Sequence, residues 1–312
     1  MFTVFAIAIS LLLVLYWLRY RVRSNPAVTP TVFILLPLML VLLVYVDRSG
    51  AESAGPGAPI VIAIAADVSL SMGTLPAPAA NEDVGTRLDR ARQTLLPLLA
   101  GLGATARPVM ISVTAFTAKS ETILAWDDDL SLVREIIEYV ITTGLLTEAG
   151  SDLGTALHGV VPLYESLPED YRGPEHAKIL ILVSDGEQTA SHANSAIAIA
   201  KLRELGVKII SLHVGLPDVP EGLPVYDEDG EFIGFEEVGG QTFSLPDPDL
   251  MGAIAGDDPT LGLFVRAESN DAATAIMNFI GLQADTSAGG RLRVGAILVL
   301  WGLLLAGLQR WV

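Results

Sequence analysis

Three oxygen-bearing side chains stand at alternate positions directly after an apolar run. The run covers residues 59–66 and leads into Asp67, Ser69 and Ser71. In an extended segment, alternate side chains point to the same side, so we expect the carboxylate and the two hydroxyls to face one way. Carboxylate and hydroxyl oxygens are hard ligands that suit Mg²⁺, Mn²⁺ or Ca²⁺. The spacing therefore predicts a cation site.

A second run, residues 178–184, is apolar between its ends and is followed at once by Asp185. Continuous apolar runs are typical of parallel strands that are buried on both faces. Open α/β sheets bind ligands just beyond the carboxyl ends of such strands. Two strands that end in aspartates at one edge of one sheet would complete the cation site.

The third segment, residues 148–157, is a loop that leads into a helix and contains Ser151. The three segments, in this order, resemble the von Willebrand factor A (VWA) domain and its metal-ion-dependent adhesion site. That family has an Asp-x-Ser-x-Ser motif, then a Thr in a Gly-rich loop, then an Asp after the fourth strand. The resemblance covers roughly residues 59–283 and implies a ligand set of Asp67, Ser69, Ser71, Ser151 and Asp185.

One of these positions departs from the family pattern. Ser151 stands where the family usually has Thr; the hydroxyl is kept, so we expect binding to survive. Each motif also has an ordinary structural interpretation, because Asp and Ser are common after strands and at helix N-termini. In that interpretation Ser151 simply caps the helix that follows it.

Predicted strands and helices alternate along the middle of the chain. Strands are expected at residues 109–116, 178–184 and 208–214, with a short edge strand at 121–125, and helices at 87–101, 130–142, 154–165 and 191–205. Such a series predicts an α/β fold with a mostly parallel sheet flanked by helices, the Rossmann-like fold that the VWA resemblance implies. Residues 216–259 interrupt the pattern, and an Asp-Gly turn within 225–233 predicts a hairpin. Further helices at 248–255 and 270–280 flank a last strand at 261–267.

Uncharged stretches near both ends of the chain predict membrane helices. They cover residues 2–18, 27–46 and 294–309, and aromatic residues stand at their ends. A spanning helix needs about 20 apolar residues. We therefore expect transmembrane helices at residues 1–20, 27–46 and 293–311 around a VWA domain at 57–283. A cleaved signal peptide is the alternative for the first helix, but a basic start and a cleavage site are absent.

Charge separates the soluble part of the chain from its ends. All 36 acidic residues lie between Asp47 and Asp285, a span with 13 basic residues and a net charge of −23. So acidic a domain repels nucleic acid. Arg19, Arg21 and Arg23 follow the first predicted helix, and the positive-inside rule places them in the cytoplasm. We therefore expect a multi-pass protein of the inner (cell) membrane with a periplasmic domain.

The VWA resemblance implies binding rather than catalysis. In that family the cation, here Mg²⁺ or else Mn²⁺ or Ca²⁺, takes an acidic side chain from a protein partner. The layout of helices also resembles the bacterial Bat (aerotolerance) membrane proteins. That resemblance implies a sister VWA membrane protein and a MoxR-type AAA+ ATPase as partners, in stress tolerance or in the maturation of envelope proteins.

A metal-dependent α/β hydrolase and a structural anchor with an idle metal site are the alternatives. Haloacid-dehalogenase-like enzymes place a second Asp two residues after the first, and that position is Ser69 here. A P-loop and a G-x-S-x-G elbow are also absent from the sequence. We therefore expect that the protein is not an enzyme.

Overall fold

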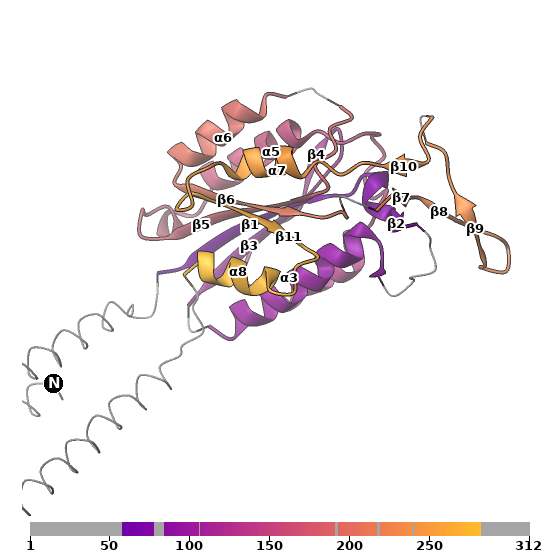
Figure 1. Ribbon diagram of the computed structural model, residues 1–312. Coiled ribbons are helices and arrows are strands. Elements are labelled where there is room, and N and C mark those ends of the chain that lie inside the picture. The colour runs from indigo at the N-terminus through magenta and orange to yellow at the C-terminus, as the bar shows by residue number, and fades with distance from the viewer. Residues whose placement is uncertain are drawn as a thin grey trace, which may run out of the picture. The chain divides into compact units, whose positions relative to one another are not determined.

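A sheet of six strands organises the structure, a computed structural model that describes residues 58–77, 84–105, 107–190, 193–216, 219–238 and 240–281 (Figure 1). Across the sheet the strands are β11 (Gly262–Arg266), β6 (Val207–His213), β5 (Ala177–Ser184), β1 (Ile60–Asp67), β3 (Val109–Phe116) and β4 (Ser120–Asp127). Neighbours are parallel except for β3 and β4, which are antiparallel. The prediction of a mostly parallel sheet with an added edge strand is confirmed.

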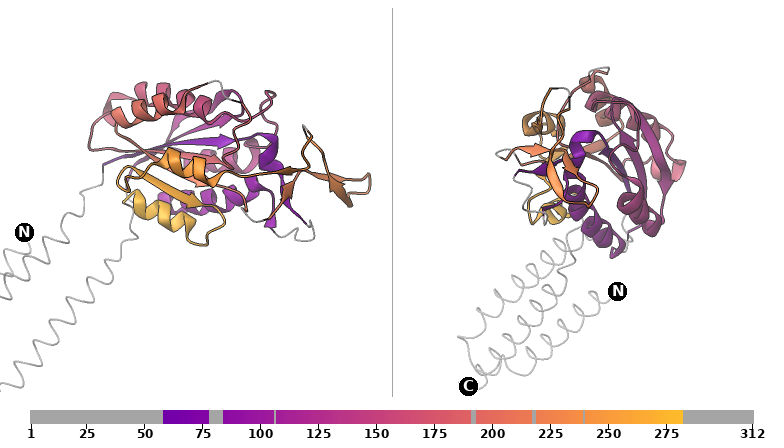
Figure 2. Two further views of the ribbon diagram at one scale, coloured as in Figure 1. Left: turned by 45° about the horizontal axis from the view of Figure 1, so that its top comes forward. Right: turned by 90° about the vertical axis from the view of Figure 1, so that its right-hand side faces the viewer.

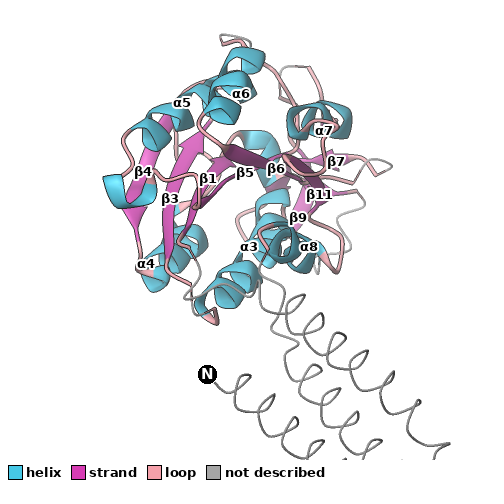
Figure 3. Cartoon of the chain, turned by 90° about the vertical axis from the view of Figure 1, so that its left-hand side faces the viewer, coloured by secondary structure: helices cyan, strands magenta, loops and turns pink. Residues whose placement is uncertain are grey.

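Helices cover both faces of this sheet (Figure 2 and Figure 3). One face packs against α3 (Arg87–Gly103), α4 (Leu130–Glu135) and α8 (Ala272–Phe279), and the other against α5 (Leu153–Glu165), α6 (Ser195–Glu204) and α7 (Pro248–Ala255). All eight residues of β1 are buried. Ile60, Ile62 and Ile64 pack in the core beneath α3 and α8, and the residues between them pack in the opposite core. Burial on both faces is why these strands read as unbroken apolar runs.

One predicted helix was only partly right. Residues 130–142 form α4 and then a single π-helical turn, η3 (Ile136–Val140), instead of one regular helix. Arg92 of α3 donates hydrogen bonds to the carbonyl oxygens of Ile137 (3.1 Å) and Ile141 (2.5 Å). The arginine thus supplies donors to carbonyl groups at the end of this segment, where the regular helical hydrogen-bond pattern is lost.

Short elements gather at the carboxyl edge of the sheet. After β1 come η1 (Leu70–Gly73) and β2 (Leu75–Pro76); at the opposite, amino edge, a 3-10 turn, η4 (Glu169–Tyr171), precedes β5. Residues 219–247, named the insert from here on, contain β7 (Glu221–Gly222), β8 (Pro224–Tyr226), β9 (Phe232–Phe235) and β10 (Phe243–Ser244). Strands β10, β7 and β2 form a small sheet, and β8 and β9 pair as the predicted hairpin.

Both ends of the described domain lie opposite the insert. Ala58 precedes β1 and Gly281 follows α8, so both stand at the amino edge of the central sheet, whereas the insert extends from its carboxyl edge (Figure 1). The predicted membrane helices at residues 1–20, 27–46 and 293–311 fall outside the described residues. Within the described part of the chain, no helix is long and apolar enough to cross a bilayer.

Candidate metal centre

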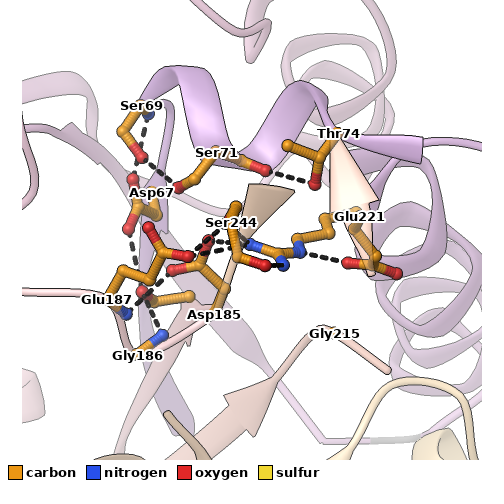
Figure 4. A network of polar contacts seen from close by, with 12 residues as sticks. Asp67, Ser69, Ser71, Thr74, Asp185, Gly186, Glu187, Gly215, Glu221 and Ser244 are labelled. Carbon is orange, nitrogen blue, oxygen red and sulfur yellow. Dashed lines mark hydrogen bonds and ion pairs between the residues drawn. The ribbon is translucent and has the colours of Figure 1, made fainter. Parts of the chain in front are cut away.

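The five predicted ligands come from three places at the carboxyl edge of the sheet. Figure 4 shows four of them, Asp67, Ser69, Ser71 and Asp185. Asp67 ends β1, and Ser69 and Ser71 follow it in the turn that becomes η1. Ser151 precedes α5, and Asp185 directly follows β5. Strands β1 and β5 are hydrogen-bonded neighbours with Ala66 opposite Val183. Adjacent parallel strands therefore bring the two aspartates to the same edge.

Asp67 is the centre of a buried hydrogen-bond network. Its side chain is fully buried, and its Oδ1 accepts a hydrogen bond from the backbone N–H of Ser69 (2.9 Å). The hydroxyls of Ser151 and Ser184 both donate to its Oδ2, each at 2.8 Å. The Oγ atoms of Ser69 and Ser71 lie 3.0 Å apart. Four of the five predicted residues are thus linked directly, and Ser184 is an additional member that the sequence reading missed.

Ser151 does not cap the helix that follows it. The N-cap of α5 is Asp152, whose side chain accepts from the backbone N–H of Thr155. The backbone N–H of Ser151 donates to Oγ1 of Thr189 (2.9 Å), which fixes the loop, and Gly150 before it has a φ of 94°. The capping interpretation of Ser151 is therefore wrong, because its hydroxyl is directed to Asp67 instead.

Ser69 does not act as a cap either. It occupies the N-cap position of η1, but its side chain makes no capping hydrogen bond. Its hydroxyl contacts that of Ser71, and both side chains point toward Asp67 in Figure 4. The turn thus places the hydroxyls of Ser69 and Ser71 on the same side as the Asp67 carboxylate.

Electrostatics at this edge disfavour a charged Asp67 when no cation is bound. Burial and the nearby charge of Asp185 raise the pKa of Asp67 to about 6, although hydrogen bonds from Ser69 and Ser184 oppose the rise. Burial and the charge of Asp185 also raise the pKa of Glu187, two residues further along. Negative charge that raises neighbouring pKa values in this way is stabilised by a bound cation.

Arg87 is the main feature of the site that the sequence reading missed. It is the first residue of α3 and is fully buried. Its Nη1 pairs with Oδ2 of Asp185 at 2.5 Å, while Oδ1 of Asp185 accepts from the backbone N–H of Glu187 (3.0 Å). Burial by itself would lower the pKa of Arg87, but the charges of Asp185 and Glu221 raise it above its ordinary value. One predicted ligand thus already has an internal cationic partner.

The same arginine ties the insert to the sheet edge. Nε of Arg87 pairs with Glu221 of β7, and its Nη1 donates to Oγ of Ser244 in β10 (2.6 Å). Arg90, one turn along α3, pairs with Glu221 (2.6 Å) and with Glu268 (3.1 Å). Arg87 also lies 3.7 Å from Glu187, so the two arginines pair with four carboxylates, those of Asp185, Glu187, Glu221 and Glu268. The buried carboxylate of Asp67 is a fifth at this edge. Negative charge remains in excess.

The residues present fit a hard divalent cation. Asp67, Ser69, Ser71, Ser151 and Asp185 offer two carboxylates and three hydroxyls, which are oxygen donors of the kind that Mg²⁺ takes. Among the described residues, no group of three or more His, Asp or Glu side chains is arranged to hold a metal ion. A cation at this edge would therefore need the serine hydroxyls as well as the two carboxylates.

Comparisons with known proteins agree with this fold. The family model of the von Willebrand factor type A domain matches residues 62–244. The solved structure of BatB from Bacteroides thetaiotaomicron is 23% identical with a TM-score of 0.53, over 71% of this chain and 97% of that one. An aerotolerance-related membrane protein from Bacteroides fragilis is 22% identical with a TM-score of 0.52, over 72% and 100%. At such identities both likenesses show the fold, and their names agree with the Bat resemblance stated from the sequence. No curated protein sequence is significantly similar to this chain.

Proposed function

Because the chain belongs to the von Willebrand factor type A domain family, we propose that it is a membrane-anchored adhesion module. A divalent cation, Mg²⁺ or else Mn²⁺ or Ca²⁺, is held by Asp67, Ser69, Ser71, Ser151 and Asp185. A protein partner supplies an acidic side chain to that cation. The observation that carries this proposal is the convergence of two buried carboxylates with three serine hydroxyls at one sheet edge.

The donor set supports a binding role. When bound, the cation supplies a positive charge that attracts a carboxylate of the partner. Mg²⁺ requires six oxygens, so five side-chain donors leave coordination to be filled from outside. Position 69, where a phosphoryl-transferring enzyme of this layout needs a second carboxylate, is a serine whose hydroxyl contacts Ser71. We therefore propose adhesion and not hydrolysis.

Titration calorimetry on the full chain in detergent tests the ligand set. Wild type is expected to bind one Mg²⁺ or Mn²⁺, and Asp67→Ala none. Asp229→Ala, which removes an exposed carboxylate of the hairpin turn, is the matched control and should bind as wild type does. Equal binding by wild type and Asp67→Ala would reject the assignment.

The proposed placement is the inner membrane, with helices at residues 1–20, 27–46 and 293–311 and the domain at 57–283 in the periplasm. Ala58 and Gly281, the ends of the described domain, both lie at the sheet edge opposite the candidate site. A domain attached to a membrane through these ends would direct the site toward other proteins. The chain has no cysteine, so single cysteines report topology directly. Ser53→Cys should react with an impermeant maleimide in spheroplasts and Ser24→Cys should not; the reverse pattern would overturn the orientation.

The Bat resemblance supports two specific partners. We propose a sister VWA membrane protein and a MoxR-type AAA+ ATPase, in a complex for stress tolerance or for the maturation of envelope proteins. Tagged full chain, purified from native membranes with Mg²⁺, should retain these proteins and should lose the partner that binds the cation when EDTA is added. Retention that is identical in Mg²⁺ and EDTA would argue against assembly through the cation.

A further inference from the structure

The insert exposes an unusual share of large apolar side chains. Twelve large hydrophobic residues of the described chain are exposed, and half of them lie between residues 226 and 245. Leu245 is 72% exposed and Ile233 is 63% exposed. We name this set the apolar ridge; it consists of Tyr226, Phe232, Ile233, Val238, Phe243 and Leu245. Such a concentration on one projecting segment is typical of an interaction surface.

Aromatic packing holds the ridge in one shape. The rings of Tyr226, Phe232, Phe235 and Phe243 follow one another edge to face, with centroids 6.2, 5.1 and 5.5 Å apart. Phe235 lies directly on the backbone of Gly222, where an added Cβ would come within 2.7 Å of the ring. A surface that is already ordered loses little conformational entropy when a partner binds.

The ridge begins beside the candidate metal centre. Ser244, between Phe243 and Leu245, bonds to Arg87 and to Glu187, and it lies next to Asp185 in Figure 4. From there the insert extends away from the carboxyl edge of the central sheet (Figure 2). A protein that reaches the cation therefore meets the ridge as well.

The negative charge near the ridge determines which partner surfaces can bind to it. Six exposed carboxylates lie in the same segment as the ridge, between residues 227 and 237, and no Lys or Arg occurs between Lys208 and Arg266. These carboxylates belong to Asp227, Glu228, Asp229, Glu231, Glu236 and Glu237. A second copy of this chain or an anionic lipid surface would be repelled, whereas Lys and Arg around an apolar cluster would be attracted.

We propose that the apolar ridge is the docking surface for a protein partner that presents an apolar cluster flanked by Lys and Arg. The cluster lies next to the acidic side chain that reaches the cation. This inference rests on the proposed function of the site and adds the chemistry of the partner's surface. The ridge supplies apolar contact area, the carboxylates of the same segment exclude acidic surfaces, and the cation fixes the position of the partner.

Photo-crosslinking of the full chain in its native membrane tests the surface. A photoreactive phenylalanine analogue replaces Ile233, and the matched control carries it at Ile197 of α6, which is 61% exposed and outside the insert. We expect a protein adduct at position 233 and none at 197. Mass spectrometry of the partner's cross-linked segment should show apolar residues flanked by Lys and Arg. No adduct at 233, equal adducts at both positions, a homodimer, a lipid adduct or an acidic segment would each overturn the proposal.

A synthetic peptide of the cross-linked segment then separates the ridge from the cation. Ile233→Asp and Leu245→Asp in the full chain should each weaken peptide binding at least tenfold, and Ile197→Asp should not change it. If Asp67→Asn abolishes binding while the ridge variants leave it unchanged, the ridge proposal fails and the metal proposal stands. If the ridge variants weaken binding and Asp67→Asn has no effect, the ridge stands and the cation is not the contact. A thermal unfolding curve like that of wild type shows that each variant is folded.

Discussion

The variant Asp67→Asn is expected to make the cation-free protein more stable at neutral pH and to abolish its response to Mg²⁺. In the wild type, burial and the charge of Asp185 raise the pKa of Asp67 to about 6. At pH 7 the folded state therefore holds a buried carboxylate, whereas the unfolded chain exposes the same group to water. An amide of nearly the same shape carries no charge that burial could disfavour.

The magnitude results from two opposing effects. A carboxyl whose pKa rises from 3.8 to about 6 lowers the free energy of unfolding by about 3 kcal/mol above pH 6 and not at all below pH 3.8. Against this, the amide NH₂ cannot accept the hydrogen bonds from Ser151 and Ser184, and each loss costs about 1 kcal/mol or less because both hydroxyls can rotate. We expect a net gain of about 1–2 kcal/mol at pH 7, or about 4 °C in Tm for a domain of this size. The gain should disappear as the pH falls from 6 toward 4, since the wild-type carboxyl then binds a proton.

Thermal unfolding of the fragment 57–283, which contains both hydrophobic cores, provides the assay. It is measured in EDTA and in Mg²⁺, at pH 7.5 and at pH 5, with Asp229→Asn as a control that should follow wild type throughout. Mg²⁺ at about 100 times its Kd should stabilise wild type by about 2.7 kcal/mol and leave Asp67→Asn unchanged, so the order of stability reverses. If Asp67→Asn unfolds below wild type in EDTA at pH 7.5, the reasoning about buried charge is refuted. If Asp67→Asn still gains stability from Mg²⁺, the ligand assignment is refuted.

Three further variants test the surroundings of the site. Arg87→Met should lower cation-free stability by about 3–5 kcal/mol, because it leaves buried carboxylates unpaired. It should also enlarge the Mg²⁺-induced rise in Tm, because Asp185 then pairs with the cation alone. An unchanged rise would contradict the inference that Arg87 and the cation share the Asp185 carboxylate. Ser151→Ala should weaken Mg²⁺ binding in calorimetry about tenfold, or about 1.4 kcal/mol, while Ser151→Thr keeps it; equal affinities would show that this hydroxyl is not a ligand. Gly154→Ala should reduce the free energy of unfolding by at least about 3 kcal/mol, because its Cβ would lie 2.1 Å from the backbone oxygen of Ala193. Gly252→Ala is the control, with open space at its Cβ, and should be neutral or slightly stabilising in denaturant titrations.

Much of the fold and the position of the candidate site could be predicted from the sequence. Apolar runs at residues 59–66 and 178–184 predict buried parallel strands, since only strands covered on both faces are apolar at every position. Oxygen donors directly after such runs must lie at the carboxyl edge, and this predicts the positions of Asp67 and Asp185. The family match over residues 62–244 confirms the VWA fold. These features depend on local periodicity and on the direction of the chain.

Other features of the site depend only on tertiary structure. Arg87 and Arg90 begin a helix with an ordinary amphipathic pattern, which is typical of exposed arginines, yet both are buried. Their partners lie far along the chain: Arg87 is 98 residues from Asp185 and 134 from Glu221. Such pairs form because the sheet and the insert bring distant segments together, and a buried guanidinium is stable only where carboxylates meet it in that arrangement. The sequence by itself determined which edge of the sheet carries the oxygen donors. The tertiary structure decided that Arg87 pairs with one of these donors, Asp185, and links the insert to it. The reason is that the energy of a buried ion pair depends on distance in space and not on spacing in the chain.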